Sequence, residues 1–198
     1  MVETRELEVS QQEIEAILPR FLGEIDQLPP IYSAIKKDGQ PLYKLARQGK
    51  DVTVEPRRVT IKSLEIIGFE SPNLRLQVDC GTGTYIRSLA HDIGQTLGCG
   101  GHVAELRRTR VGGFTRADSV PIDEIAPENV ADLLKPMELA VAHLPRLTVD
   151  SIEAERLKHG KRIPRSSDEP MVSVWENGGF LGLVQADGDE WRVRKLFI

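Results

Sequence analysis

The sequence predicts an α+β fold: a mixed or antiparallel sheet with helices, followed by a small β-rich module. Apolar residues recur at helical spacing in 11–22 and again in 84–97. They alternate, as in strands, between residues 57 and 80. At 198 residues and 40% hydrophobic composition, the chain can bury the core of a medium domain and a small module. We therefore expect domains at 1–143 and 144–198.

The first predicted helix covers residues 11–22. Ser10 is a good N-cap, and Glu13 stands three residues later, as a capping box requires. Gly23 is expected to end this helix. Paired prolines then exclude a helix, so residues 27–34 should be extended.

The middle of the chain predicts a hairpin with helices before and after it. A short helix is expected at 41–48, because proline stands at its start and glycine just past its end. Alternating apolar residues predict a strand at 57–69 and its partner at 74–80, joined by a Ser-Pro-Asn turn. A helix at 84–97 and a further strand at 103–114 should follow.

The last third begins with residues 122–143, which look helical in pieces that prolines interrupt. A short strand at 147–149 and a helix at 152–159, with Ser151 as its cap, should follow. Asn-Gly-Gly and Asp-Gly-Asp are hairpin signals between the last strands. Those three strands are expected at 171–175, 180–185 and 191–197.

The charge distribution says more than the formal net charge of −4. Residues 1–30 hold seven acidic side chains, whereas residues 36–62 hold eight basic against three acidic ones. Further basic clusters lie at 107–116 and 156–165. Salt screening makes such patches act locally, so they can bind phosphates on an acidic protein. The alternative interpretation is ordinary solvated charge.

Several classes of protein do not fit the sequence. The apolar runs are too short for a transmembrane helix, and the acidic N-terminus lacks the apolar core of a secretory signal. Cys80 and Cys99 do not form a disulfide framework, which favours a reducing cytoplasm. Cys99 and His102 form a single pair with the spacing of metal ligands, whereas a structural zinc site usually needs two such pairs. Residues 81–84 lack the rest of a phosphate-binding loop. We expect no metal and no cofactor.

The most informative local pair is Tyr85 and Arg87, where a strand gives way to a helix. An aromatic ring and a guanidinium near a helix start suit a flat base and a negative group. Tyr32 and Tyr43, in a segment with lysines such as Lys36, add an aromatic and basic surface. Unstacked RNA bases bind to surfaces of this kind. The alternative is that each tyrosine only packs.

Two carboxylates lie near this pair in the sequence. Asp79 ends a predicted strand and could face the turn before Arg87, and Asp92 lies on the helix that follows. Arg87 could also approach Asp92 at the helix surface. We interpret these residues as structural pairs rather than as catalytic groups.

Four segments, in order, resemble a known family. They are LPPIYSAIKKDGQPLYKLARQGKDV, RRVTI, CGTGTYIRSLAHDIGQTLGCGGHVAELRRTRVGGF and IDEI. They closely resemble the bacterial TruB family, the tRNA pseudouridine-55 synthases, over about residues 10–125. The tail from about Leu144 resembles that family's PUA-like RNA-binding module.

The resemblance implies an activity and roles for particular residues. The family converts one uridine of the tRNA T loop into its C-glycoside isomer without cofactor or metal, on a flipped-out base. Tyr85 matches the tyrosine of the base pocket, and Arg87 matches the arginine that pairs with the catalytic aspartate. Leu106 matches the leucine that walls the uracil pocket. Residues expected at the RNA-facing surface are Tyr32, Lys36, Arg47, Arg107 and Arg108.

The sequence departs from the family in one respect. The family's catalytic aspartate lies in a G-x-L-D-P motif, followed by a second tyrosine in K-x-Y, and neither motif occurs here. Asp79 and Asp92 do not occupy the catalytic position. We therefore expect the C-terminal portion of a synthase, inactive alone, with a separate N-terminal segment supplying the aspartate. The alternatives are a non-catalytic protein that binds or folds tRNA and an unrelated structural or metabolic domain.

Overall fold

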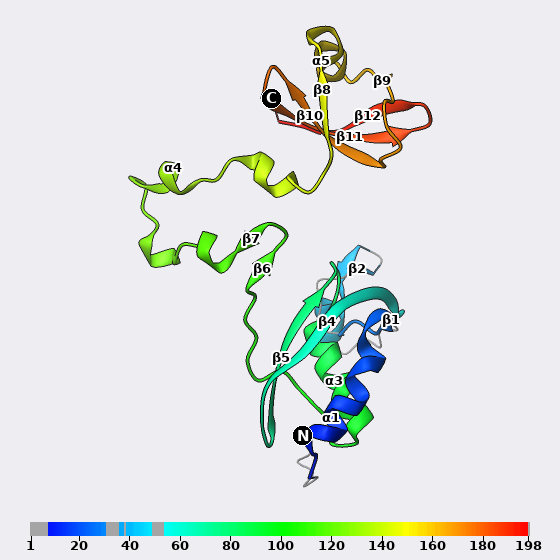
Figure 1. The fold of residues 1–198 in the computed structure, drawn as a ribbon, viewed down its shortest axis with the longest axis vertical. Coiled ribbons are helices and arrows are strands. Elements are labelled where there is room, and N and C mark those ends of the chain that lie inside the picture. Colours follow the sequence, from blue (N-terminus) through cyan, green and yellow to red (C-terminus); the bar gives the residue numbers. More distant parts are fainter. Residues whose placement is uncertain (1–7, 31–35, 38, 49–53, 198) are drawn as a thin grey trace. The chain divides into compact units, whose positions relative to one another are not determined.

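The structure is a computed structural model, and the chain forms two compact units, residues 1–106 and 107–198 (Figure 1). Each unit has its own hydrophobic core. The predicted module at 144–198 lies inside the second unit, and its status as a separate domain stays a prediction. The residues that the structure describes are 8–30, 36–37, 39–48 and 54–197.

The first unit is built on a three-stranded antiparallel sheet in the order β1-β4-β5. Its strands are β1 (Gly23–Gln27), β4 (Arg57–Glu70) and β5 (Asn73–Cys80). The hairpin of β4 and β5 confirms the two strands that the alternating apolar residues predicted. Strand β1 was not predicted, because its five residues show no apolar alternation. It is defined by its pairing with β4, from Gly23 opposite Ile61 to Gln27 opposite Arg57.

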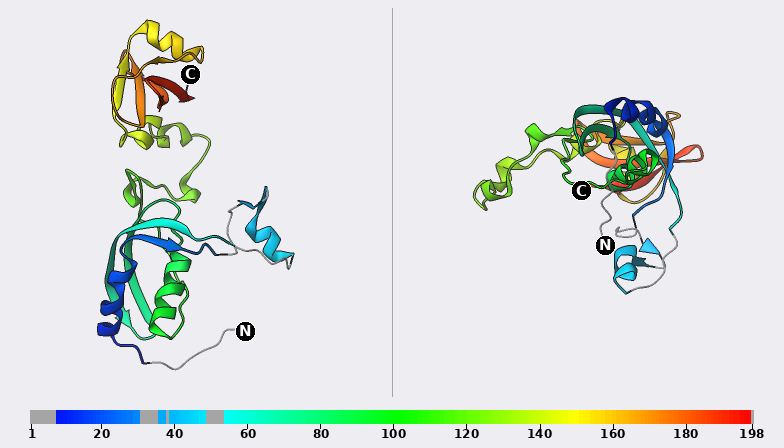
Figure 2. Two further views of the ribbon diagram at one scale, coloured as in Figure 1. Left: turned by 90° about the vertical axis from the view of Figure 1, so that its right-hand side faces the viewer. Right: turned by 90° about the horizontal axis from the view of Figure 1, so that it is seen from below.

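Two helices pack with this sheet around one core (Figure 2). Helix α1 (Gln11–Ile17) continues into a 3-10 turn (Leu18–Phe21), and α3 (Ile86–Leu97) follows β5. The predicted capping box is present: the Glu13 amide donates to Ser10 Oγ, and the Ser10 amide donates to Glu13 Oε2. The buried core residues are Ile14, Leu18, Phe21, Ile61, Leu64, Leu89 and Ile93.

The helix predicted at 84–97 begins two residues later, because Tyr85 is its extended N-cap. It ends at Gly98, whose positive φ of 80° is a conformation that glycine adopts readily. The predicted short helix is α2 (Leu42–Arg47). It follows the small hairpin of β2 (Lys36–Lys37) and β3 (Gln40–Pro41).

The strand predicted at 103–114 is wrong in most of its length. The strand residues there are β6 (Arg110–Val111) and Phe114, which begins β7 (Phe114–Thr115) and pairs with β6 across the Gly112-Gly113 turn. Residues 103–109 have no strand partner among the described residues. Extended chain becomes a strand only when a neighbour satisfies its amide and carbonyl groups, and the local pattern cannot supply that neighbour.

Short helical pieces follow β7 in the second unit, as predicted from its prolines. Between residues 116 and 141 the chain makes 3-10 turns and a one-turn helix. These pieces are Arg116–Asp118, Ile122–Glu124, α4 (Val130–Leu133) and Met137–Val141.

A five-stranded sheet in the order β8-β10-β11-β12-β9 completes this unit. Its core includes the fully buried Trp191, together with Val174, Val184 and Leu157. The three predicted strands are confirmed as β10, β11 and β12, whereas the two-residue β9 was not predicted. The bounds are β8 (Arg146–Val149), β9 (Ile163–Pro164), β10 (Met171–Glu176), β11 (Gly179–Asp187) and β12 (Glu190–Leu196).

The helix predicted at 152–159 is α5 (Ser151–Lys158), and its cap is Asp150 rather than Ser151. Aspartate and serine are comparable N-caps, so the choice depends on the partner three residues later. Glu153 is in register with Asp150, and its amide donates to the Asp150 carboxylate at 2.8 Å. Ser151 is therefore the first helical residue.

Candidate functional site

The site predicted around Tyr85 is held by a compact turn between β5 and α3. The Gly81 amide donates to the Thr60 carbonyl at 2.8 Å, which ties the start of the turn to β4. Thr84 Oγ1 donates to the Gly81 carbonyl at 3.0 Å, and Gly83 has a positive φ of 84°. The turn thus directs the chain from the end of β5 into the first turn of α3.

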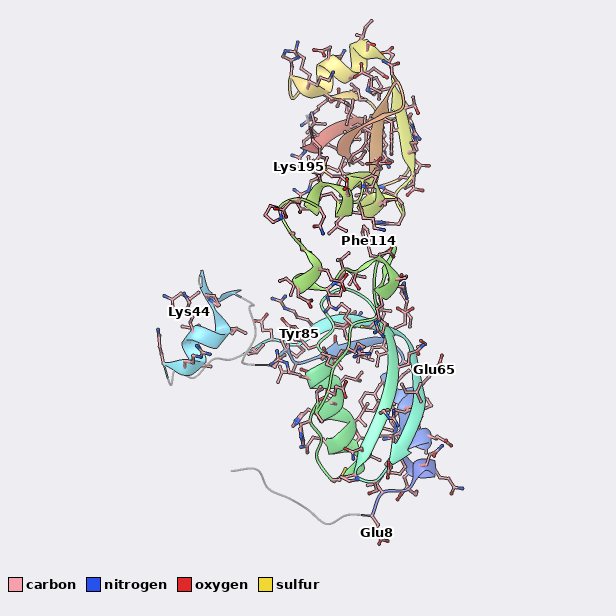
Figure 3. All side chains as sticks on the ribbon, turned by 90° about the vertical axis from the view of Figure 1, so that its left-hand side faces the viewer. Glu8, Lys44, Glu65, Tyr85, Phe114 and Lys195 are labelled. Atoms are coloured by element: carbon pink, nitrogen blue, oxygen red, sulfur yellow. The ribbon has the colours of Figure 1, made fainter. Side chains whose placement is uncertain are left out.

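Tyr85 is half-buried at the N-terminal end of α3 (Figure 3). Its amide donates to Gln27 Oε1 at 2.7 Å. One helical turn later, Ser88 Oγ donates to the Leu28 carbonyl at 2.7 Å. Two bonds from the end of β1 therefore fix both the start and the first turn of α3.

Arg87 lies in that first turn and is exposed. A cation at this position does not stabilise the helix, because the N-terminal end of the helix dipole favours negative charge. The guanidinium and the helix terminus together favour an anionic group. The position therefore suits the role of holding a carboxylate or a phosphate.

The two nearby carboxylates have different surroundings. Asp79 is half-buried on β5, and neither it nor Arg87 lacks a partner. Asp92 is half-buried on α3, where burial raises the pKa of its carboxyl group and the neighbouring His91 partly offsets this. Asp92 follows Arg87 by five residues, about 140° around a helix, so the two start from different faces of α3.

The glycine-rich stretch after α3 packs closely against the helix. A Cβ on Gly94 would lie 2.2 Å from the Gly100 carbonyl carbon, and one on Gly101 would lie 2.4 Å from the Ala90 carbonyl oxygen. The Gly100 amide donates to the Gly94 carbonyl at 2.9 Å. Because no side chain intervenes, the chain turns back directly along α3.

Leu106, Arg107 and Arg108 follow this stretch without regular secondary structure. Leu106, the predicted wall of the uracil pocket, is 61% exposed, and several other large apolar residues are at least as exposed. Both arginines are exposed, and neither has an ion-pair or hydrogen-bond partner among the described residues. The predicted roles of all three stay predictions.

The predicted surface segment at 31–53 is only partly described. Tyr32 lies outside the described residues, and Lys36 is in β2 without a described side chain. Arg47 is exposed at the end of α2, the helix that also carries Lys44 (Figure 3).

Much of the predicted basic charge is already paired. Arg58 lies between Glu24 and Asp26 of the adjacent strand, at 3.9 and 3.7 Å. In the third cluster, Lys158 pairs with acidic residues and Arg162 forms an ion pair with Asp187 at 2.8 Å. Structural ion pairs hold these side chains. The exposed Arg107 and Arg108 fit the alternative of ordinary solvated charge as well as that of a phosphate-binding patch, and the patch stays a prediction.

The expectation that the cysteines bind no metal stays a prediction. Cys80 and Cys99 are unpaired and half-buried, and Cys99 Sγ lies 3.2 Å from its neighbour's carbonyl oxygen. The described residues contain no group of three or more potential metal ligands. Among the helices described, none is long and apolar enough to cross a membrane.

Sequence reasoning missed Gln27. This glutamine is only 1% exposed, although it stands in a stretch that reads as polar and extended. The sequence signal that could have identified it is its position two residues before the paired prolines, next to the first segment that resembles the TruB family.

Two family descriptions match consecutive parts of this chain. Residues 1–86 match "TruB family pseudouridylate synthase (N terminal domain)". Residues 87–142 match "tRNA pseudouridylate synthase B C-terminal domain". The boundary between the matches falls between Ile86 and Arg87, inside the first turn of α3.

Similar proteins carry consistent names. The chain is 46% identical to "tRNA pseudouridine synthase B" of Pseudomonas fluorescens, over 96% of this chain and 65% of that protein. It is 42% identical to the protein of that name from Aromatoleum aromaticum, over 95% of this chain and 62% of the relative. The chain thus spans just under two thirds of the relatives' length.

Among solved structures, a chain of "Crystal Structure of a Cbf5-Nop10-Gar1 Complex" matches with a TM-score of 0.76 and 25% identity. The match covers 96% of this chain and 63% of that one. A chain of "Crystal structure of the archaeal box H/ACA sRNP Nop10-Cbf5 complex" matches at 24% identity with a TM-score of 0.70, which shows the likeness of fold.

Proposed function

Because the chain belongs to the TruB family of pseudouridylate synthases, we propose that it takes part in converting uridine 55 of the tRNA T loop to pseudouridine. The observation that carries the proposal is the turn from Cys80 to Arg87. It holds Tyr85 and Arg87 at one helix start in a chain 46% identical to a tRNA pseudouridine synthase B.

The proposed reaction breaks the bond between C1′ of the ribose and N1 of uracil and forms one between C1′ and C5. The proton on C5 is lost to solvent, and N1 gains one, so the product is an isomer. Tyr85 offers a flat face to the base. Arg87 keeps a catalytic carboxylate ionised by charge pairing. Leu106 excludes water from the base, which strengthens these electrostatic contacts. No metal or cofactor takes part in this scheme.

The catalytic aspartate is proposed to come from a segment with the G-x-L-D-P motif, which this sequence does not contain. Asp79 and Asp92 are not assigned that role. The relatives are longer than the part matched here, which is compatible with such a segment.

We also propose where the RNA lies on the chain. Tyr32, Lys36, Arg47, Arg107 and Arg108 are the candidate contacts. Because Arg107 and Arg108 are exposed and have no described partner, they are available to phosphates.

Residues 144–198 are proposed as the PUA-like RNA-binding module. Its aromatic side chains support this: Phe180 lies 5.3 Å from Trp175 and 5.6 Å from Phe197, between ring centroids. The Arg146 guanidinium lies 3.9 Å above the Trp175 ring. Aromatic and guanidinium planes of this kind stack on unpaired bases. A cytoplasmic location is proposed as well, because the free thiols Cys80 and Cys99 stay reduced there.

The second candidate is a protein that binds or folds tRNA without modifying it. The exposed side chains of Arg107 and Arg108 suit RNA binding without turnover as well as with it. Both candidates predict tRNA binding that weakens steeply with salt. They differ in turnover, because only the first predicts isomerisation when the motif is supplied.

The test is the Arg87→Ala variant, assayed for pseudouridine formation in the presence of a segment that carries the motif. Loss of a charge-assisted pair should lower turnover roughly 10- to 100-fold. Arg75→Ala, at an exposed arginine on β5, is the matched control and should keep full turnover. Unchanged turnover in the Arg87 variant would refute the assigned role.

A further inference from the structure

Gln27 is a buried polar side chain of the first unit. It ends β1 and is 1% exposed. Burying an amide group is unfavourable unless its atoms find hydrogen-bond partners. The position of this glutamine therefore requires an explanation beyond packing.

One of its two polar atoms has a specific partner. Gln27 Oε1 accepts from the Tyr85 amide at 2.7 Å, across 58 positions of sequence. Tyr85 is the N-cap of α3, and its own side chain makes no capping bond. Serine, threonine, aspartate and asparagine are the usual residues there, because their side chains cap the helix locally. Tyr85 is not suited to capping the helix in this way. Gln27, which lies outside the helix, therefore holds the helix start through the Tyr85 amide.

The other polar atom, Nε2, makes this arrangement less stable. Gln27 Nε2 is buried and has no hydrogen-bond partner among the described residues. An unpaired buried donor destabilises a fold. If the site needed only to be filled, methionine would occupy nearly the same volume without that penalty. The acceptor at Oε1 is the property that methionine lacks.

We propose that Gln27 is a positioning residue that fixes the Tyr85 backbone, so that the tyrosine ring meets the target base in one orientation. This inference rests on the function proposed above. Ser88 provides the second tie, through the Leu28 carbonyl, so consecutive residues of one chain segment hold both sides of Arg87. The bond from Gln27 is the one made to Tyr85 itself.

The test compares Gln27→Met, which removes the acceptor, with Gln27→Glu, which keeps an acceptor oxygen in either protonation state. Val59→Ala is the control, because Val59 is a buried residue of β4 paired with Ile25 of β1 and does not touch Tyr85 through a hydrogen bond. All variants are made in the full chain. Their probes are a T-arm stem-loop RNA with uridine at the target position and the same RNA with an abasic ribose there.

The first readout is hydrogen exchange of the Tyr85 amide, followed by NMR. Gln27→Met should speed it roughly ten-fold, whereas Gln27→Glu should not. The second readout is the ratio of affinities for the uridine and abasic RNAs. Wild type should prefer the uridine RNA by on the order of ten-fold, and Gln27→Met should bind both alike. Binding to the abasic RNA should stay constant, because it depends on phosphate contacts.

The outcomes separate this inference from the proposed function. Unchanged Tyr85 exchange in Gln27→Met overturns the anchoring role. A retained preference for uridine in that variant overturns the positioning role, as does an equal loss of preference in Val59→Ala. A wild-type chain that binds both RNAs alike instead overturns the proposed base pocket, while the exchange measurement still decides whether Gln27 anchors Tyr85.

Discussion

The residues around the start of α3 are poor choices for local stability. Tyr85 stands at an N-cap without capping it, and Arg87 places positive charge where the helix dipole disfavours it. Gln27 is buried, and its amide nitrogen has no hydrogen-bond partner in the described part of the chain. Such local conflicts are typical of functional sites, where the stability lost at one position is recovered elsewhere in the fold. In the first unit, the apolar core shared by α1, α3 and β4 supplies this stability.

Gly94 is expected to be the least replaceable small residue near the site. In Gly94→Ala the new methyl group would meet the Gly100 backbone at 2.2 Å, so α3 or the following turn must move. Overpacking of this kind costs about 1–3 kcal/mol of unfolding free energy. Chemical denaturation followed by circular dichroism measures it. Gly81→Ala is the control, because its methyl group would find ordinary contacts at 3.6 Å.

Equal stability of the Gly94 and Gly81 variants would contradict the close packing of the turn on α3.

For single residues, the sequence predicted only part of the site. It identified Tyr85 and Arg87 by their chemistry. It did not identify Gln27, because the role of that residue depends on a partner 58 positions away.

Among the helices and strands, the sequence correctly predicted features that depend on residues close together in the chain. The capping box at Ser10 and the hairpin of β4 and β5 depend on neighbours in sequence, and both are confirmed. Strand β1 and the unpaired stretch at 103–109 depend on which distant segment supplies hydrogen bonds, and both were missed. The cap of α5 shifted by one residue because Glu153 is in register with Asp150.

The turn at Arg116–Asp118 should lose stability in acid. Hydrogen bonds from the Thr115 amide and hydroxyl, together with Lys135, lower the pKa of Asp118 to about 2. Because this folded pKa lies below the usual value of 3.8, the carboxylate stabilises the turn above pH 4. That contribution is lost as the pH falls from about 4 to about 2.

Protection of the Thr115 amide from hydrogen exchange, corrected for intrinsic exchange, measures this loss. Protection should fall across that pH range in the wild-type chain. In Asp118→Asn, which cannot ionise, it should be lower and independent of pH over the range. A pH-independent protection in wild type would contradict the role given to the carboxylate.

For the whole molecule, the chain has two compact units with separate cores. The sequence predicted an α+β fold and a β-rich C-terminal part, and the solved relatives share this fold. It did not predict a division at residue 106, because residues 103–114 looked like one continuous strand. A boundary between two units lies where few packing contacts connect them. The apolar periodicity of one segment carries no information about such contacts.

The two units should respond separately to core substitutions. Both tryptophans, Trp175 and Trp191, belong to the second unit, so their fluorescence reports its unfolding. Leu89→Ala empties a site in the first core and should cost about 2–5 kcal/mol there. It should lower the unfolding midpoint seen by circular dichroism and leave the tryptophan midpoint unchanged.

Val174→Ala, in the core of the second unit, is the matched substitution and should lower the tryptophan midpoint. If Leu89→Ala shifted the tryptophan transition as much as the circular dichroism transition, the units would unfold as one cooperative block.

We propose that this chain supplies the base-binding and arginine side of a uridine-isomerising site. The most direct test is tritium release from tRNA whose uracil is labelled at C5, with the chain alone and with a segment that carries the G-x-L-D-P motif. We predict that the chain alone binds the tRNA without release, and that release appears when the segment is added. Release by the chain alone, or bound tRNA that stays unmodified with the segment present, would contradict this proposal.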